Sequence, residues 1–205
     1  QSVIKGGPAV AAVEEITKRL SDQVPNNPYT FRITVVRSDI VNAFALPGGS
    51  VVVFTGLLKK AESPEEVAGV LGHELNHVLL RHGMARIVKT AGLVAVVSIL
   101  VGEQPGGGLA KQLAVDLLTL KFSREQETEA DLGGLRLLRR ANIDPKGMIT
   151  FFERLSENDQ LQIEILSTHP MSGGRAERLK AEAGSLPKGE PVPFTFDWKA
   201  VQAAL

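Results

Sequence analysis

The segment His73-Glu74-Leu75-Asn76-His77 holds the residues of this chain that are best suited to chemistry. On a helix of 3.6 residues per turn, His73 and His77 lie on one face, one turn apart. Two imidazoles so placed can bind one small cation, most often zinc. Glu74 lies beside that cation without having to bind it, and can accept a proton from a zinc-bound water. The pattern H-E-x-x-H therefore predicts metal-dependent hydrolysis, although so short a pattern also arises by chance.

A catalytic zinc site needs a third protein ligand, which must be a histidine or a carboxylate because the chain has no cysteine. His82 lies five residues after His77, about 140° around a continuous helix, and is expected to be an exposed or capping residue. Better candidates are Glu127 and Asp131, which lie four residues apart in an acidic run and share a helix face. Glu129 is expected to point elsewhere. Such a run is also typical of a solvated helix surface, and its residues alone leave both interpretations open.

A capping signal places the two histidines on a helix. Ser63-Pro64-Glu65-Glu66 has serine at the N-cap, proline at the first helical position and glutamate at the third. This predicts a helix from Pro64 to about Arg81, with Gly83 as its stop. Gly69 and Gly72 are poor helix formers, so we expect another backbone to approach this helix closely.

A second capping box, Ser123-Arg124-Glu125-Gln126, predicts that the acidic run also lies on a helix, which continues to about Arg140. Alternating apolar residues and turn signals predict three short strands that form an antiparallel meander. The C-terminal tail, with the only tryptophan, is expected to pack back on the body. The strands are predicted at Tyr29–Val36, Asn42–Leu46 and Ser50–Thr55, and further helices at Pro8–Leu20, Leu109–Leu120, Pro145–Ser156 and Ser172–Ala183.

Composition sets broad limits. The chain has 205 residues, enough for one domain with a substantial core, and 23 basic residues balance 23 acidic ones. A nucleic-acid binder usually carries a basic surplus, so no nucleic-acid partner is expected. The most apolar run, Ala91–Val101, is about half the roughly 20 residues that span a bilayer. We expect it to be a buried helix, with a membrane contact or a mobile gate as alternatives.

Several motifs occur in the order found in a known family. They are the stretch from Asn42 to Gly49, the H-E-x-x-H segment, the segment Ser123–Asp131, and Thr168-His169-Pro170 followed by Arg175. With these motifs the chain resembles metallopeptidase family 48, zinc endopeptidases that include the CAAX prenyl protease, HtpX and BepA-like enzymes. The chain lacks the long apolar spans of the membrane members and the C-terminal helical-repeat domain of the BepA-like proteins. A soluble domain of the BepA-like branch is therefore expected.

The resemblance implies roles for individual residues. His73, His77 and Glu127 would bind one zinc ion per chain, and Glu74 would be the general base. Asp131 would hold a ligand histidine by its far N–H, which fixes the ring and raises its basicity.

The resemblance also implies a substrate-binding edge strand made of Asn42, Ala43, Phe44 and Ala45, which would pair with an extended polypeptide. His169 and Arg175 would approach from the far side and could stabilise the oxyanion; in some relatives this histidine is thought to plug the site. The alternatives are a simple loop residue for His169 and a charge on the helix surface for Arg175.

The expected fold is a single α+β domain over residues 1–205, mostly helical and zincin-like (gluzincin), with a small antiparallel sheet beside the H-E-x-x-H helix. The expected function is zinc-dependent hydrolysis of peptide bonds in unfolded or misassembled proteins. A periplasmic or envelope-associated location, with possible peripheral association, follows from the resemblance alone. One alternative is a zinc-holding chaperone or assembly factor with little protease activity. Another is a latent enzyme in which His169 is a fourth ligand.

Overall fold

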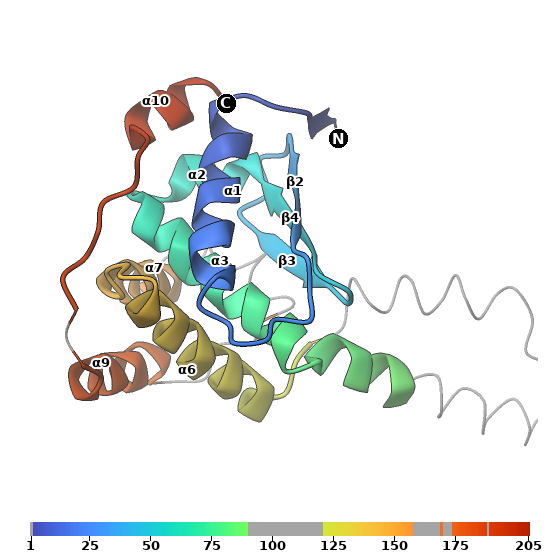
Figure 1. Ribbon diagram of the computed structural model, residues 1–205, viewed down its shortest axis with the longest axis vertical. Helices are drawn as coiled ribbons and strands as arrows, with labels where there is room; N and C mark the ends of the chain where they lie inside the picture. Colours follow the sequence, from blue (N-terminus) through green and yellow to red (C-terminus); the bar gives the residue numbers. More distant parts are fainter. Residues whose placement is uncertain (1, 90–120, 158–168, 170–173, 188) are drawn as a thin grey trace, which may run out of the picture.

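The computed structural model describes residues 2–89, 121–157, 169, 174–187 and 189–205. The apolar run Ala91–Val101 and the helix predicted at Leu109–Leu120 lie outside the described residues, and so does the start of the helix predicted from Ser172. The described part is an α+β fold in which helices predominate (Figure 1). Its helices are α1 (Pro8–Ser21), α2 (Thr55–Lys60), α3 (Pro64–Leu79), α6 (Arg124–Arg140), α7 (Lys146–Glu157), α9 (Arg175–Ser185) and α10 (Trp198–Ala203).

A small mixed sheet is built from β1 (Val3–Ile4), β2 (Arg32–Val36), β3 (Ala43–Leu46) and β4 (Ser50–Phe54), in the order β1-β2-β4-β3. The antiparallel expectation holds for β3 with β4, but β2 and β4 run parallel, so the predicted meander is wrong. Side-chain alternation determines which face is buried, not which strands are neighbours. The most continuously apolar strand, β4, takes the centre, and β3 is left at the end of the sheet beside α3.

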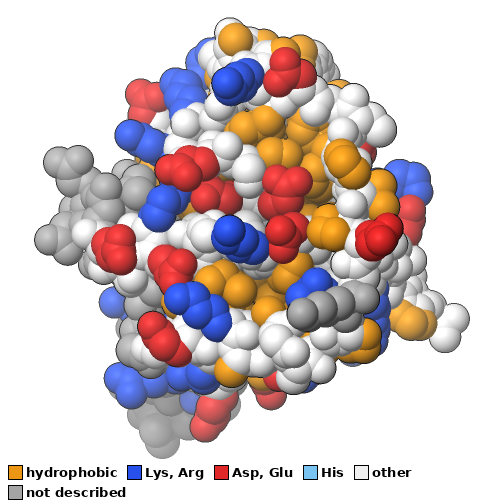
Figure 2. Space-filling view, turned by 90° about the vertical axis from the view of Figure 1, so that its left-hand side faces the viewer, with side chains coloured by type: hydrophobic (Ala, Val, Ile, Leu, Met, Phe, Trp, Pro, Cys, Tyr) orange, Lys and Arg blue, Asp and Glu red, His pale blue; other side chains and the backbone are white. Residues whose placement is uncertain are grey.

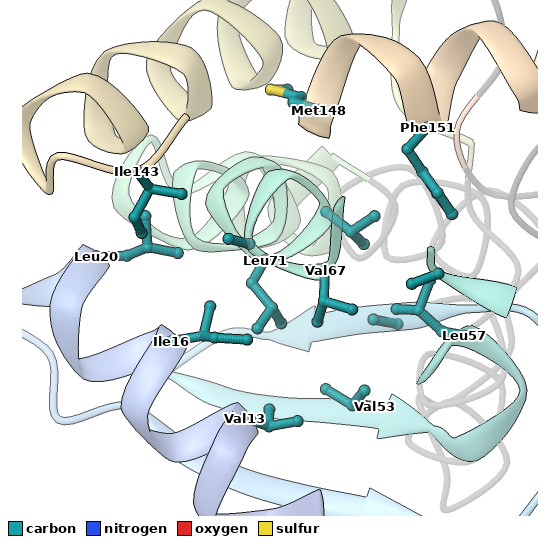
Figure 3. Packing of buried hydrophobic residues seen from close by; sticks show 14 of the residues in the cluster. Val13, Ile16, Leu20, Val53, Leu57, Val67, Leu71, Ile143, Met148 and Phe151 are labelled. Carbon is teal, nitrogen blue, oxygen red and sulfur yellow. The ribbon is translucent and has the colours of Figure 1, made fainter. Parts of the chain in front are cut away.

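Helix α3 is enclosed on several sides. It packs against α1 and β3 on one side and against α6 and α7 on the other (Figure 1). Figure 3 shows Ile16 of α1 pointing toward Leu71 of α3, and Val13 of α1 pointing toward Val53 of β4, with Val67 of α3 above Val53. All five side chains are fully buried. A helix enclosed in this way holds the groups on its flank in fixed positions.

Both predicted helix starts are confirmed. At α3 the Ser63 hydroxyl accepts a hydrogen bond from the Glu66 N–H, while the Glu66 carboxylate accepts one from the N–H of Glu62 rather than of Ser63. At α6 the capping box is complete, because Ser123 and Gln126 each accept a hydrogen bond from the other's backbone N–H. The acidic run therefore begins at a defined helical phase.

Helices α3 and α6 approach closely where glycines face each other, as the glycines of α3 led us to expect. A Cβ on Gly72 would lie 3.3 Å from the carbonyl oxygen of Gly134, and a Cβ on Gly134 would lie 2.9 Å from the backbone nitrogen of His73. A Cβ at Gly134 would force one of the helices to shift, and one at Gly72 would be tightly packed against α6. The contact brings the acidic face of α6 onto the histidines of α3.

Helix α3 ends earlier than predicted. Its last residue is Leu79, Leu80 is the C-cap, and Arg81 has a left-handed φ of 57°. A new helical stretch begins at once over residues 82–89, and it includes Gly83. The prediction that Gly83 stops the helix is wrong, since a non-glycine residue takes the left-handed position. The break redirects the chain at His82.

The C-terminal tail packs back on the body, as predicted. The Trp198 indole N–H donates to the carbonyl of Ala61 at 3.2 Å, and the Arg19 guanidinium donates to carbonyls of both Ala141 and Val192 at 3.0 Å. Figure 2 shows basic and acidic side chains interspersed around a band of hydrophobic ones on one face. Among the described residues, none of the helices has the length and apolar character needed to cross a membrane.

Candidate metal centre

Four buried side chains from separate parts of the chain converge on one point. His73 and His77 come from α3, Glu127 comes from α6, and His169 lies between α7 and α9 in sequence. One ligand atom from each lies within 4.8 Å of those of the other three. The structure therefore brings together the three residues expected to bind the metal and adds His169 to them.

His73 is held from behind by a buried ion pair. Its Nδ1 lies 2.8 Å from Asp131 Oδ1, and Asp131 accepts hydrogen bonds from Arg175 Nε at 2.6 Å and Nη2 at 2.5 Å. The guanidinium also lies 3.9 Å from the ring centroid of Phe152. Arg175 is 2% exposed, so the alternative of a surface charge is wrong. The position of Asp131 is that expected for a residue that orients a ligand histidine.

His77 is held by a different chain of contacts, which the sequence did not predict. Its Nδ1 lies 3.0 Å from Nδ1 of His82, and His82 Nε2 lies 3.1 Å from Glu129 Oε2. His82 is 4% exposed, so its prediction as an exposed or capping residue is wrong. His82 would lie about 140° away from His77 only on a continuous helix, whereas the left-handed Arg81 turns His82 back toward His77. Glu129 points away from Glu127, as expected, but toward this second histidine.

These contacts favour one assignment of protons to the ring nitrogens. Asp131 can only accept, so a neutral His73 that donates to it carries its proton on Nδ1 and presents a lone pair at Nε2. Arg175 Nη2 also lies 3.2 Å from this Nδ1, but it already donates to Asp131 at the shorter distance of 2.5 Å. Glu129 likewise receives the Nε2–H of neutral His82, so His82 accepts at Nδ1 and His77 donates there. The Nε2 lone pairs of His73 and His77 then face each other at 2.9 Å. Two acceptors at this distance cannot form a hydrogen bond, and a cation between them resolves the conflict.

The charges around this point favour a cation as well. Burial lowers the pKa of His73 well below its ordinary value and that of His77 to about 4. Both rings are therefore neutral imidazoles near neutral pH, each with a single N–H. Burial by itself raises the pKa of Glu127, but the hydrogen bond with His169 and the other histidines around the carboxylate outweigh burial and lower that pKa overall. Glu127 Oε2 is buried and has no hydrogen-bond partner among the described residues. The residues therefore fit a metal ion.

Glu74 lies next to this group and is oriented by the edge strand. Its Oε2 accepts a hydrogen bond from the backbone N–H of Ala45 at 3.0 Å, and its Oε1 lies 3.3 Å from Nε2 of His169. Burial raises the pKa of the Glu74 carboxyl to about 7. The His169 ring spans from Glu74 to Glu127, since its Nδ1 lies 3.0 Å from Glu127 Oε1. His169 is buried in the site, so the alternative of a simple loop residue does not hold.

The predicted substrate strand lies beside the site as β3. In its antiparallel pairing with β4, Asn42 accepts a hydrogen bond from the Phe54 N–H. The backbone groups of Ala43 and Ala45 therefore point to the opposite edge. The N–H of Ala43 donates to the Asn42 side chain at 2.8 Å. The Phe44 side chain contacts that of Phe54, with ring centroids 5.8 Å apart. A small pocket lined by Asn42, Ala43, Glu74 and His169, together with Val70, His73, Phe151, Phe152 and Arg175, joins this strand to the site.

Comparison with known proteins agrees with this geometry. A family model described as peptidase family M48 matches residues 10–183. The mitochondrial metalloendopeptidase OMA1 of Arabidopsis thaliana is 40% identical over 75% of this chain and 32% of its own length. The Escherichia coli metalloprotease YcaL is 30% identical over 83% of this chain and 68% of its own. The E. coli beta-barrel assembly-enhancing protease is 30% identical over 85% and 39%. This chain thus spans between 32% and 68% of the length of these relatives.

Proposed function

This chain belongs to peptidase family M48, and from that premise we propose that it is a zinc-dependent endopeptidase with Glu74 as its general base. The observation that carries the proposal is the convergence of unprotonated His73 and His77 nitrogens with the Glu127 carboxylate, in a buried group. Two histidines and one carboxylate are a common ligand set of catalytic zinc. We further propose that residues 1–205 form a single catalytic domain.

His73, His77 and Glu127 would hold the zinc ion. When bound, zinc supplies a Lewis acid that polarises the scissile carbonyl and makes the attacking water more acidic. Glu74 Oε1 accepts the water proton, while the Ala45 N–H keeps Oε2 in place. The water oxygen bonds to the carbonyl carbon, the C–N bond breaks, and Glu74 passes the proton to the leaving amine.

Asp131 and Arg175 would orient a metal ligand without binding the metal themselves. Asp131 fixes the His73 ring by accepting from Nδ1–H. Arg175 remains a candidate for stabilising the oxyanion, but two of its nitrogens are bound to Asp131, which favours a positioning role.

We propose that the substrate is an extended polypeptide that adds as a strand to β3. Asn42, Ala43, Phe44 and Ala45 would form the binding edge. Because the N–H groups of Ala43 and Ala45 are engaged by Asn42 and Glu74, the substrate would donate to their carbonyl oxygens. Such recognition through backbone atoms suits unfolded or misassembled proteins, since it requires an extended chain and little sequence. We propose that nucleic acids are not among its partners.

The names of the relatives suggest where such an enzyme would act. One bacterial relative is named for β-barrel assembly, which favours the periplasm or a peripheral position in the cell envelope. Another relative is named as mitochondrial, so a mitochondrial location is the rival proposal.

The position of His169 favours a second candidate, a latent form of the same enzyme. Its ring bridges the metal group and Glu74, where the attacking water and the scissile carbonyl would have to lie. His169 as a fourth ligand would exclude water, whereas an aid to the transition state would have to move aside first. His169→Ala should raise casein cleavage if the ring blocks the site, and lower it if the ring takes part in catalysis.

Two variants test the proposed function. Glu74→Gln should lower casein cleavage by about 100-fold or more, because the base is lost, while zinc content stays near one per chain. Glu127→Ala should instead lose the metal. The exposed Glu125→Gln on the same helix as Glu127 is the matched control and should leave both properties unchanged. Cleavage that survives Glu74→Gln would exclude the mechanism, and full zinc affinity in Glu127→Ala would exclude that ligand.

A further inference from the structure

We infer that His82 is a positioning residue for the metal site: it fixes the ring of His77 and is itself fixed by Glu129. The inference rests on the proposed function, since it needs a metal at His77. The observation behind it is a line of contacts from the ligand set to the protein surface. His77 Nε2 faces the other ligands, His77 Nδ1 faces His82 Nδ1 at 3.0 Å, and His82 Nε2 faces Glu129 at 3.1 Å.

For a neutral His82, the contact with Glu129 allows one arrangement of protons. A carboxylate only accepts, so Glu129 holds the Nε2–H form of neutral His82. His82 then presents a lone pair at Nδ1, and His77 must carry its proton on Nδ1. This is the tautomer in which His77 Nε2 is free to bind a metal. Without the acceptor at His82, either nitrogen of His77 could carry the proton, and part of the population would present an N–H to the cation.

The packing around His77 holds the ring plane but does not choose its tautomer. Phe122 stacks on the His77 ring with centroids 3.9 Å apart and planes inclined by 26°. An aromatic ring supplies neither a hydrogen-bond donor nor an acceptor in its plane, so it cannot select the protonated nitrogen. That selection falls to His82, whose ring lies 5.0 Å from that of His77. Phe122 and His82 thus have separate roles on one ligand.

The fold contains the device that makes this contact. His82 directly follows Arg81, whose left-handed φ ends one helix and starts the next. A continuous helix would carry His82 about 140° away from His77. Nothing else in the proposed reaction uses His82 or Glu129, yet His82 is 4% exposed and both of its nitrogens face a partner.

The test measures zinc affinity rather than cleavage. His82→Asn places an acceptor oxygen near the Nδ1 position, whereas His82→Phe keeps the ring shape without any nitrogen. His82→Gln keeps a polar side chain but carries its amide farther out, near the Nε2 position. Removing such a supporting partner typically weakens metal binding by about 10- to 100-fold. We expect that loss for His82→Phe and His82→Gln, and a loss below about threefold for His82→Asn.

Zinc dissociation constants are measured by competition with a chromophoric chelator, and far-UV circular dichroism of the metal-free proteins checks folding. The visible spectrum of the cobalt-substituted protein should match the wild type in His82→Asn and differ in His82→Gln. If His82→Phe does not fold, the comparison of Gln with Asn carries the test. Equal zinc affinity in all variants, or an equal loss in Asn and Gln, would overturn the inference. Failure of the wild type to bind zinc would instead overturn the proposed function.

Discussion

The two histidines of α3 are one turn apart, yet the residues that hold their rings differ in solvent exposure. We call these residues the supports of His73 and His77. His73 is held by Asp131, whose side chain is 5% exposed and paired with the buried Arg175. His77 is held through a second imidazole by Glu129, whose side chain is 63% exposed. The first support is part of the protein interior and the second reaches solvent. Two neighbouring ligands can therefore be oriented by parts of the fold that differ greatly in their exposure to solvent.

The difference has an energetic consequence. A buried carboxylate and guanidinium are stable only as a pair, so removal of either leaves a charge in a poorly solvated place. The His82–Glu129 contact has water at its outer end, and water can replace a lost partner there. We therefore expect changes on the His73 side to alter folding and metal binding together, and changes on the His77 side to alter mainly metal binding.

Asp131→Ala should have the largest effect. It leaves Arg175 buried without its carboxylate, which should lower the free energy of unfolding by about 3–5 kcal/mol. It also frees the His73 ring and should weaken zinc binding by about 10- to 100-fold. Urea unfolding of the metal-free protein and chelator competition measure the two effects. An unchanged unfolding free energy in the metal-free variant would contradict the proposed difference between the two supports.

Gly134→Ala should have an intermediate effect on both supports, because Asp131 and Glu129 lie on the same helix. The new Cβ would lie 2.9 Å from the His73 backbone nitrogen and 3.0 Å from the carbonyl carbon of Gly72. Overpacking typically costs about 1–3 kcal/mol, of which the better helix propensity of alanine offsets about 1 kcal/mol.

The matched control for Gly134→Ala is Gly184→Ala in α9, where a Cβ would have no atom within 4 Å. That substitution should stabilise the protein slightly. Thermal unfolding compares the two variants. A Gly134→Ala protein as stable as the control would show that the close contact of α3 and α6 is not needed to hold the site.

Glu129→Ala should have the smallest effect. The carboxylate is largely exposed, and water can accept the His82 proton in its place, so zinc affinity should fall by less than about threefold. The difference from wild type should shrink in 1 M salt, where exposed charges are screened. Chelator competition at low and high salt measures this. A loss as large as that in Asp131→Ala would mean that the two supports are equivalent.

The sequence predicted the elements better than their pairing. Capping residues such as Ser63 and Ser123 act within four positions, so helix starts can be predicted locally. The order of the strands depends on which of them packs most deeply, and that is decided by the whole sheet. For this reason the predicted meander is wrong. The predicted position of β3 beside α3 is confirmed.

The expected ligands were found together because H-E-x-x-H and the acidic run each keep a simple helical phase. His82 was missed because its position depends on a left-handed residue that is neither glycine nor asparagine. A sequence signal did exist: His82 shortly after the motif and Glu129 shortly before Asp131 both had no predicted role. Without the break at Arg81, geometry gave no reason to pair them.

The most direct test of the account is a crystal structure of the protein loaded with zinc, with anomalous diffraction measured at the zinc absorption edge. We expect one anomalous peak, about 2.0–2.2 Å from His73 Nε2, His77 Nε2 and a Glu127 oxygen. His77 Nδ1 should still face His82, and the fourth position should hold water in the active form or His169 in the latent one. The absence of a peak at this point, or ligation through Nδ1 of either α3 histidine, would contradict it.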